Sequence, residues 1–387
     1  MEFIERYQKY NASPESLRLL GAYLDKVFVG PRCVKLHVNS FCNFKCVFCW
    51  YHSKFVKKSK KKKALPFEKF KEIVDDSRIM GVEQISILGE GEPTLHPDIF
   101  KMIKYAKKSD IRVMIDTNLS IHPKHLKHML EIDLIRVNLS AVSPKKHGFL
   151  QAGGSDKMFY RVLKNLKFLY EIKSKNKLKL NKPVVHIVYI LNKYNFKDID
   201  KMLKICSKFG IEYVEFKLMQ ANSDTSSLIL SPKEMKELKL LIEKLLKAQR
   251  EYKYRTNLYE VLDIIKRSIN CDRKTVQFEN ACYNRFFYLN TLASNNIRCY
   301  TGWYYVHIDI NGNVFPCCNH QQFLVGNIYR NRLIEIWNSD KFHQARIKYK
   351  YEINTDNDFW IECRYCPLIK FNKEIDKKLQ RLRNKNV

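Results

Sequence analysis

The chain has 387 residues, 45% of them hydrophobic and 13% aromatic, which is enough to bury the core of one large domain and one smaller domain. It has no apolar run of about 18 residues and no basic-then-apolar N-terminus, so we expect neither a membrane span nor a signal peptide. Seventy Lys and Arg against 40 Asp and Glu give a formal net charge of +30. This charge would attract anionic partners, but the excess is mostly Lys spread along the chain, which AT-rich coding sequence also produces without selection for binding.

Short β-type runs alternate with helical patterns along the first part of the chain, which is typical of repeated βα units and a parallel sheet. We expect strands at 34–39, 84–88, 111–115, 134–139, 184–190 and 213–218. Helical patterns lie between them at 67–79, 97–107, 122–130, 158–170 and 196–209. Six such repeats are fewer than the eight of a closed barrel. A further helical stretch at about 232–269 leads into a C-terminal region that is rich in cysteine.

Three cysteines follow the first expected strand, at Cys42, Cys46 and Cys49, with the spacing CxxxCxxC. A short loop with three thiolates can hold three irons of a [4Fe-4S] cube and leave the fourth iron open for chemistry. A zinc knuckle or a disulfide is the alternative for the triplet alone. In a cytoplasmic, reducing compartment, which we expect for this chain, its twelve cysteines favour metal ligation over disulfides.

A second motif, Gly91-Glu92-Pro93, follows the second expected strand, one βα unit after the triplet. Together with the aromatic Phe48 before the last cysteine, it resembles the radical S-adenosylmethionine (radical SAM) superfamily. Glu90 departs from the first glycine of that family's GGEP motif. The resemblance implies an α/β fold with a (βα)6 partial TIM barrel. It also implies a cluster that binds SAM, cleaves it to a 5'-deoxyadenosyl radical and thereby abstracts a hydrogen atom from the substrate.

The same resemblance implies which strand-end residues would contact SAM. The glycine turn would bring backbone and the Glu92 carboxylate to the SAM amino group, and Asn118 and Ser140 would face its ribose or carboxylate. Ordinary polar strand ends are the alternative for the last two. The expected SAM-binding residues are Phe48, Gly91, Glu92, Pro93, Asn118, Ser140, Ile190 and Leu218.

Four well-spaced cysteines in the C-terminal region predict a second metal site: Cys299, Cys317, Cys363 and Cys366. The segment before Cys317 contains Asn311-Gly312 flanked by alternating residues, which indicates a β-hairpin. The pattern resembles the C-terminal extension of SPASM and Twitch radical SAM proteins, and four ligands suit the shorter Twitch form with one auxiliary [4Fe-4S] cluster. A zinc ribbon is the alternative, because four thiolates also suit tetrahedral zinc.

The expected domain division follows from these motifs. Residues 1–30 form an N-terminal extension, 31–230 the radical SAM partial barrel and 231–280 a helical bridge. Residues 281–387 form a small Twitch/SPASM-like domain with a β-hairpin and a helix. The remaining cysteines Cys33, Cys206, Cys271 and Cys282 have no partner spacing and are expected to be structural, with Cys282 a reserve ligand of the auxiliary site.

Cys318 directly follows an expected cluster ligand, where the related anaerobic sulfatase-maturating enzymes have an acid that serves as catalytic base. Two hypotheses remain open. Cys318 donates a hydrogen atom to a substrate radical, which would give epimerisation, or it packs as a small buried residue.

In Twitch relatives the auxiliary cluster accepts a second electron from the substrate, which suits a two-electron oxidation. The sequence therefore favours an oxidoreductase, a dehydrogenase or an epimerase, acting on a small anionic carbohydrate-type metabolite, with an electron donor such as flavodoxin or ferredoxin. The first alternative is a maturase of a ribosomal peptide, and the absence of an N-terminal leader-binding domain argues only weakly against it. A nucleic-acid-binding iron-sulfur protein is the distant alternative, and it leaves the Gly91-Glu92-Pro93 motif unexplained.

Overall fold

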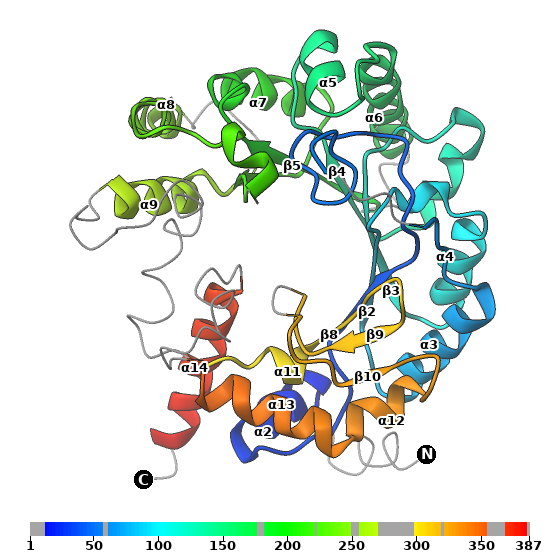
Figure 1. Cartoon of the computed structure of the whole chain (residues 1–387). Coiled ribbons are helices and arrows are strands. Elements are labelled where there is room, and N and C mark those ends of the chain that lie inside the picture. Colours follow the sequence, from blue (N-terminus) through cyan, green and yellow to red (C-terminus); the bar gives the residue numbers. More distant parts are fainter. Residues whose placement is uncertain are drawn as a thin grey trace.

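The computed structural model describes residues 12–56, 61–175, 182–220, 223–248, 255–269, 298–318, 321–353 and 368–384. One ten-stranded sheet curves through the molecule in the order β10-β9-β8-β1-β2-β3-β4-β5-β6-β7, with helices on its outer face (Figure 1). The strands are β1 Cys33–His37, β2 Gln84–Leu88, β3 Arg112–Thr117, β4 Leu134–Asn138, β5 Val184–Leu191, β6 Tyr213–Leu218, β7 Arg255–Thr256, β8 Tyr305–Ile308, β9 Asn313–Phe315 and β10 Gly326–Asn327.

The first six strands and their helices confirm the expected partial barrel. All pairings from β1 to β6 are parallel, and α3 (Phe67–Ile79), α4 (Ile99–Lys108), α6 (Lys157–Lys175) and α7 (Ile199–Lys208) connect them. Alternate side chains of β1 lie on opposite faces of the sheet. Val34 and Leu36 belong to the main hydrophobic core beneath the helices, whereas Lys35 and His37 lie on the opposite, barrel-facing side. The polar members of each strand therefore line the barrel.

Several boundaries differ from the sequence expectations. The segment expected as a helix at 122–130 is the 3-10 helix η2 (Pro123–Glu131), which begins at a proline and carries only one buried stripe. A 3-10 turn, η1 (Pro93–Leu95), precedes α4, and an additional short helix, α5 (Pro144–Leu150), precedes α6. The Ser143 hydroxyl caps α5 by accepting a hydrogen bond from the Lys146 amide.

The expected helical bridge is two helices, α8 (Pro232–Ala248) and α9 (Leu258–Ile269). Between them lies the short strand β7, which pairs in parallel with β6 and which the sequence did not predict. A strand of two residues is too short to leave an alternating pattern in the sequence.

The C-terminal region continues the barrel sheet. β8 pairs in parallel with β1, and β9 and β10 follow as antiparallel neighbours, so that eight strands of the sheet, β8 and β1 to β7, run parallel. The hairpin between β8 and β9 turns at Gly312, whose φ of 80° favours glycine. The Asp309 carboxylate closes this turn by accepting hydrogen bonds from the amides of Asn311 and Asn313 at 2.8 and 2.9 Å. The sequence predicted the hairpin but not its pairing with β1.

The N-terminal helix α2 (Pro14–Leu24) packs with the C-terminal helices α11 (Thr301–Tyr304) and α14 (Ile369–Asn384). α12 (Leu333–Asn338) and α13 (Asp340–Tyr351) lie nearby in the same part of the molecule (Figure 1). The small core shared by these elements is Ala22, Tyr300, Trp303, Tyr304, Ile375 and Leu379. The described part of the expected N-terminal extension thus packs against the C-terminal region through α2.

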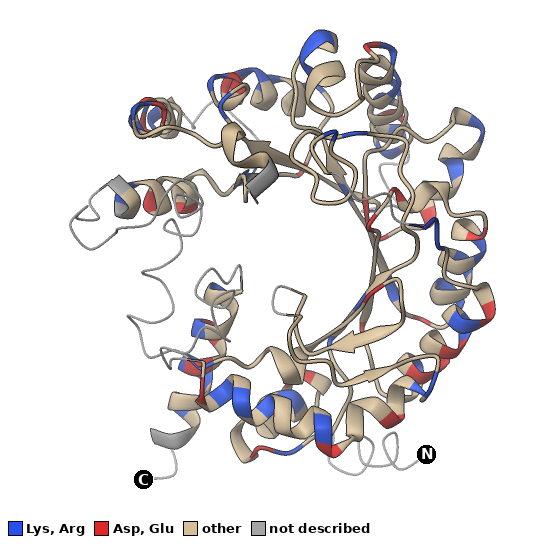
Figure 2. Ribbon diagram, viewed as in Figure 1, with Lys and Arg blue, Asp and Glu red and all other residues tan. Residues whose placement is uncertain are grey.

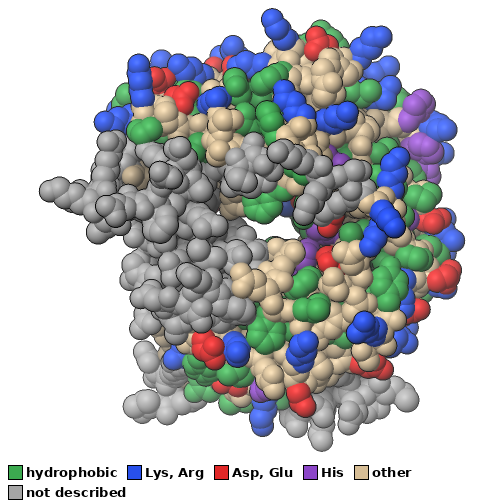
Figure 3. All heavy atoms as spheres, in the orientation of Figure 1, with side chains coloured by type: hydrophobic (Ala, Val, Ile, Leu, Met, Phe, Trp, Pro, Cys, Tyr) green, Lys and Arg blue, Asp and Glu red, His purple; other side chains and the backbone are tan. Residues whose placement is uncertain are grey.

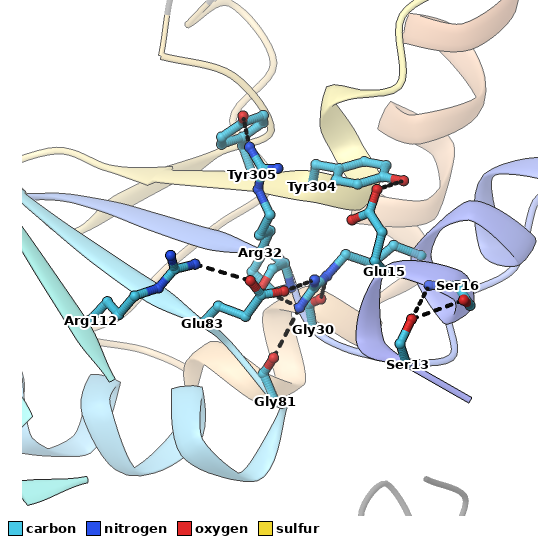
Figure 4. A network of polar contacts seen from close by, with 12 residues as sticks. Ser13, Glu15, Ser16, Gly30, Arg32, Gly81, Glu83, Arg112, Tyr304 and Tyr305 are labelled. Atoms are coloured by element: carbon cyan, nitrogen blue, oxygen red, sulfur yellow. Dashed lines mark hydrogen bonds and ion pairs between the residues drawn. The ribbon is translucent and has the colours of Figure 1, made fainter. Parts of the chain in front are cut away.

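A polar network joins α2 to the barrel (Figure 4), and it includes the buried Arg18 of α2 and the half-buried Arg32 just before β1. Arg18 donates to the carbonyls of Gly30 and Gly81, both at 2.9 Å, and pairs with Glu83, which also accepts from Arg112 at 3.1 Å. Arg32 donates to the Tyr305 hydroxyl of β8 at 2.9 Å. Because breaking a buried charged network leaves unpaired charge, these contacts hold the relative positions of β1, β2 and β8. In the part of the chain that the structure describes, no helix has the length and apolar character that crossing a membrane needs.

Candidate active site

The loop with the cysteine triplet begins after β1, at the carboxyl edge of the barrel, as parallel barrels place their chemistry. Two backbone hydrogen bonds fix it on α5 and the residue that follows it: the Lys45 amide donates to the Gln151 carbonyl at 3.0 Å, and the Val47 amide to the Leu150 carbonyl at 2.9 Å. The Asn43 side chain adds a 2.7 Å hydrogen bond to the Ser120 hydroxyl after β3. The loop is therefore held from two sides.

The surroundings of the three thiols suit a cationic cluster of metal ions. Burial raises the pKa of Cys42 to about 12 and raises the pKa values of Cys46 and Cys49, and in Cys46 the other two thiols raise it further. Backbone amides nevertheless point at sulfur: the Phe44 amide donates to Cys42, and the Tyr51 and His52 amides donate to Cys49, each at 3.3 Å. A bound metal cluster would stabilise the thiolates of this buried loop, because its positive charge takes the place of the thiol protons.

Within the described ranges, no three His, Cys, Asp or Glu side chains converge as ligands of a single metal ion. A cube differs from a zinc site in this respect, because each thiolate binds a different iron.

The Gly91-Glu92-Pro93 turn lies directly against the cysteine loop. A Cβ on Gly91 would lie 1.9 Å from the Phe41 carbonyl oxygen, so only glycine allows this approach. The Gly91 amide donates to the Asn39 carbonyl and the Glu92 amide to the Phe41 carbonyl. The turn and the loop thus form one hydrogen-bonded unit.

The Glu92 carboxylate is used by the protein itself. One oxygen accepts from the Thr94 amide and hydroxyl and from the Thr117 hydroxyl at 2.6 to 3.1 Å, and the other accepts from the Asn118 amide at 2.7 Å. Burial raises the pKa of Glu92, and these four hydrogen bonds oppose that shift. The sequence interpretation directed this carboxylate at the SAM amino group. In the structure it joins the ends of β2 and β3, which leaves the backbone of the turn as the acceptor for a ligand amine.

Asn118 and Ser140 also organise strand ends. The Asn118 amide group donates to the Asn43 oxygen in the cysteine loop at 3.0 Å. The fully buried Ser140 hydroxyl accepts from the Ile190 amide of β5 at 2.9 Å. The structure therefore brings Ser140 and Ile190 together, and it connects Asn118 to the triplet.

A small apolar cluster lies beside Cys46. It contains Val47, Phe48, Ala141, Leu150, Met219 and Leu228, with Cys46 and Ile190 packed against it. Such a surface suits the faces of an aromatic ring such as adenine. Leu218, the residue expected here, packs instead against the main core, and its neighbour Met219 takes the place beside Phe48. The period-2 alternation of β6 puts adjacent residues on opposite faces, so an error of one position reverses the assignment.

Cys318 lies on the barrel-facing side, beside Lys35 of β1. The Lys35 ammonium donates to the Cys318 sulfur at 3.1 Å and lies 5.1 Å from the centre of the Tyr305 ring. Although burial opposes its charge, Cys318 raises the pKa of Lys35. The hydrogen bond with Cys317 lowers the pKa of Cys318 most, and Lys35 lowers it further. Since an iron-bound thiolate has no proton to donate, ligation of Cys317 would remove the first of these effects and leave the contact with Lys35.

Two of the four expected auxiliary ligands lie in the described part of the chain. Cys299 and Cys317 are buried in one small cluster with Tyr349 and Ile353. The Cys299 sulfur hydrogen-bonds with the Thr301 hydroxyl at 3.0 Å, and burial raises its pKa. Cys363 and Cys366, like Cys271 and Cys282, lie outside the described residues. Cys33 and Cys206 are buried, and Cys33 contacts the Ser86 hydroxyl of β2.

The barrel wall also carries a network of ion pairs that was not predicted from residue spacing. Arg136 of β4 binds both oxygens of Asp116 at 3.2 Å and one oxygen of Glu215 at 2.7 Å, and Lys217 binds Glu215 at 3.3 Å. The four residues of this network lie on β3, β4 and β6, and two are positively and two negatively charged. The opening in the middle of the surface in Figure 3 is bordered by histidine and acidic side chains.

Comparison with known proteins agrees with this site. A family model described as the radical SAM superfamily matches residues 36–206, and one described as an iron-sulfur cluster-binding domain (SPASM) matches residues 299–367. The solved structure of Streptococcus suis SuiB bound to S-adenosylmethionine superimposes with a TM-score of 0.59 at 17% identity, over 89% of this chain and 75% of that one. This likeness shows the shared fold.

Curated relatives match over different shares of their length. The MJ1632 protein of Methanocaldococcus jannaschii, named after glycyl-radical enzyme activating enzymes, is 28% identical over 44% of this chain and 62% of its own length. Mycofactocin maturase MftC of Mycobacterium tuberculosis is 24% identical over 46% of this chain and 43% of its own. The AdoMet-dependent heme synthase of Methanosarcina barkeri is 22% identical over 82% of this chain and 85% of its own. The two family models, the partial barrel and the cysteine loop at its carboxyl edge agree: the chain belongs to the radical SAM superfamily and carries a SPASM-type auxiliary iron-sulfur domain, so its cofactors are a [4Fe-4S] cluster, S-adenosylmethionine and auxiliary iron-sulfur.

Proposed function

We propose that the chain is a radical SAM oxidoreductase whose substrate is a small anionic carbohydrate-type metabolite. The observation that carries this proposal is the Cys318–Lys35 pair on the barrel-facing side of β1 and the adjoining hairpin. Lys35 lies in the middle of β1, two residues before its carboxyl end, and Cys318 follows β9, so a substrate in the barrel would have a thiol and an ammonium beside it. When bound, the cluster and SAM supply the radical that removes a hydrogen atom from the substrate.

In this proposal Cys42, Cys46 and Cys49 hold the SAM cluster, and Cys299, Cys317, Cys363 and Cys366 hold the auxiliary cluster. The apolar cluster around Phe48 receives adenine, and the Gly91 to Pro93 turn receives the amino group through its backbone. A flavodoxin- or ferredoxin-type protein supplies electrons, and the cysteine-rich composition fits a cytoplasmic enzyme.

Cys318 acts as the hydrogen-atom donor. Its S–H bond breaks and a C–H bond forms on the substrate radical, which leaves a thiyl radical. One electron from the protein donor then gives the thiolate. A proton from solvent then restores the thiol, and the Lys35 ammonium, at 3.1 Å, stabilises the thiolate until that proton arrives. The substrate has exchanged one hydrogen, so the net reaction is an epimerisation.

Solvent deuterium tests this role, because an S–H exchanges with D2O while a carbon-bound hydrogen does not. We expect the wild-type product formed in D2O to carry one deuterium at the attacked carbon, and Cys318→Ala to release 5'-deoxyadenosine without that product. Cys206→Ala, which removes another buried thiol, is the matched control and should behave as wild type. Unlabelled product from wild type, or labelled product from Cys318→Ala, would rule out Cys318 as the donor.

A peptide maturase is the second candidate, because MftC is named a maturase and a SuiB structure holds a precursor peptide. The match to a heme synthase, which extends over 82% of this chain and 85% of that protein, favours a small molecule instead. The deciding measurement is 5'-deoxyadenosine release with a low-mass anionic metabolite fraction and with a peptide fraction. Stimulation by peptides alone would replace our proposal with the maturase, and salt-sensitive RNA binding without SAM cleavage would point to the distant nucleic-acid alternative.

A further inference from the structure

Three nitrogen-bearing side chains form a cationic corner of the barrel where β1 meets β8. Lys35 and His307 are register partners on these parallel strands, and the His37 and His307 rings meet edge to face with their centres 4.8 Å apart. Within the described residues, Lys35 contacts the Cys318 sulfur and the Tyr305 ring and pairs with no carboxylate. Among the described residues, Lys35 is the cation of this corner, and the Cys318 sulfur is its hydrogen-bond partner.

Lys35 has hydrogen-bond capacity left over. An ammonium group has three donors, and one of them points at the Cys318 sulfur, which is a weak acceptor. Among the residues described, the other two have no protein acceptor. The side chain is half-buried, so water can satisfy these donors only in part and an anion can reach them.

His307 offers a further donor, which its tautomer determines. The Gln321 amide nitrogen lies 3.2 Å from His307 Nε2, and the same nitrogen donates to the Cys318 carbonyl at 3.3 Å. The carbonyl contact fixes the orientation of the Gln321 amide, so Nε2 of His307 must accept and Nδ1 carries the proton. In the described part of the chain, this buried Nδ1 has no hydrogen-bond partner.

The electrostatic field where β1 meets β8 disfavours protonation of His307 and favours binding of an anion. Burial lowers the pKa of His307 well below its ordinary value, and His37 and Lys35 lower it further. His307 is thus a neutral donor beside a cation. A buried donor without an acceptor is energetically costly, and a bound oxygen anion would supply the missing acceptor.

We propose that Lys35 and His307 form a subsite for an oxyanion group of the substrate, a phosphate or a carboxylate. Two Lys35 donors and the His307 Nδ1–H bind its oxygens. This inference rests on the proposed function, since it gives the anionic group of that substrate a place beside Cys318. The ion network around Arg136 cannot do the same, because Asp116 and Glu215 already occupy its guanidinium.

Oxyanion binding can be measured without turnover, with SAM and reductant omitted, by calorimetric titration of the reconstituted protein at fixed ionic strength. The probes are inorganic phosphate and acetate, which separate the two oxyanion classes. Lys35→Met keeps most of the stem and removes the charge, and we expect it to weaken binding of the preferred probe by about 10- to 100-fold. Lys217→Met removes a barrel cation of the Arg136 network and is the matched control, which should bind as wild type.

Two substitutions of His307 provide a second test of the subsite if Lys35→Met does not fold. Gln places its polar atom near the position of Nε2 and lacks the Nδ1 donor, whereas Asn places a donor near Nδ1. We expect His307→Gln to lose affinity and His307→Asn to retain more of it.

Three results would overturn the subsite: wild-type binding by Lys35→Met and His307→Gln, equal losses in Lys35→Met and Lys217→Met, or unchanged binding with a shifted reduction potential of the auxiliary cluster. The last result would mean that Lys35 serves as a counter-charge to that cluster. Since no turnover is involved, failure of this test leaves the deuterium experiment on Cys318 intact, and failure of that experiment leaves the subsite standing.

Discussion

His147 should make the cysteine loop sensitive to acid. The side chain is fully buried in α5 against Phe44 and Phe159, with ring centres 5.3 and 5.7 Å apart, and neither ring nitrogen has a hydrogen-bond partner among the described residues. Burial lowers the pKa of His147 from 6.5 to about 4. The imidazole is therefore neutral in the folded loop at any pH above that value.

The sign and size of the effect follow from this shift. Between pH 6.5 and 4 the opened chain binds a proton at His147 that the folded chain does not, so stability falls as pH falls and then levels off. A shift of this size corresponds to about 3 kcal/mol. Replacing His147 with Leu removes the titrating group, and an apolar side chain also removes two buried nitrogens that lack partners.

Opening of the cysteine loop can be measured by hydrogen exchange of its backbone amides. The amides of Lys45 and Val47 donate to carbonyls at the end of α5, so their protection measures whether the loop stays docked. In apo protein we expect wild-type protection to drop between pH 7 and pH 5, after correction for intrinsic exchange, and His147→Leu to lose most of this drop. His343→Gln, at an exposed position of α13, is the matched control. An acid response of His147→Leu equal to that of wild type would refute the reasoning.

Three further predictions test the framework around the site. Asp133→Asn should lower the urea midpoint by removing a carboxylate that binds Lys107, Lys182 and the Val113 amide. Against burial, these contacts lower the pKa of Asp133, so the difference from wild type should begin to shrink as pH falls below 3.8 and be lost below the lowered pKa of the folded state; a difference that stays constant as pH falls through this range would contradict the assignment. Gly91→Ala should lower iron content and SAM affinity, because its Cβ collides with the Phe41 carbonyl; wild-type values for both would show that the loop adjusts at no cost. Simultaneous replacement of Cys42, Cys46 and Cys49 with Ala should leave about four irons per chain at the auxiliary site, and one zinc with no iron would favour the zinc ribbon.

The sequence predicted the first six strands well because each is a short β-branched run bounded by turn residues, and their parallel order follows from the helices between them. It predicted the position of the cysteine triplet for the same reason, since the loop comes directly after β1. Functional residues that follow a strand in sequence are placed by local pattern alone.

Residues that act across strands could not be found in this way. Lys35 reads as an ordinary charged residue in a strand, and only the pairing of β1 with β8, nearly 270 residues away, brings it to Cys318. Glu92 shows the opposite case: the motif located it, yet its carboxylate is taken up by Thr94, Thr117 and the Asn118 amide from another strand. Whether a polar side chain is free for a ligand depends on long-range contacts, which residue spacing does not encode.

The pairing of β1 with β8 also explains how two separate sets of cysteines can serve one reaction. In a parallel pair the carboxyl ends lie at the same edge, so the loop after β1 and the hairpin after β8 both face the mouth of the barrel. The Cys42 loop and the Cys317–Cys318 turn are thereby held by one rigid hydrogen-bonded ladder, with Lys35 between them. A sheet fixes such distances more tightly than a linker between two domains would. The auxiliary region is thus an extension of the barrel wall.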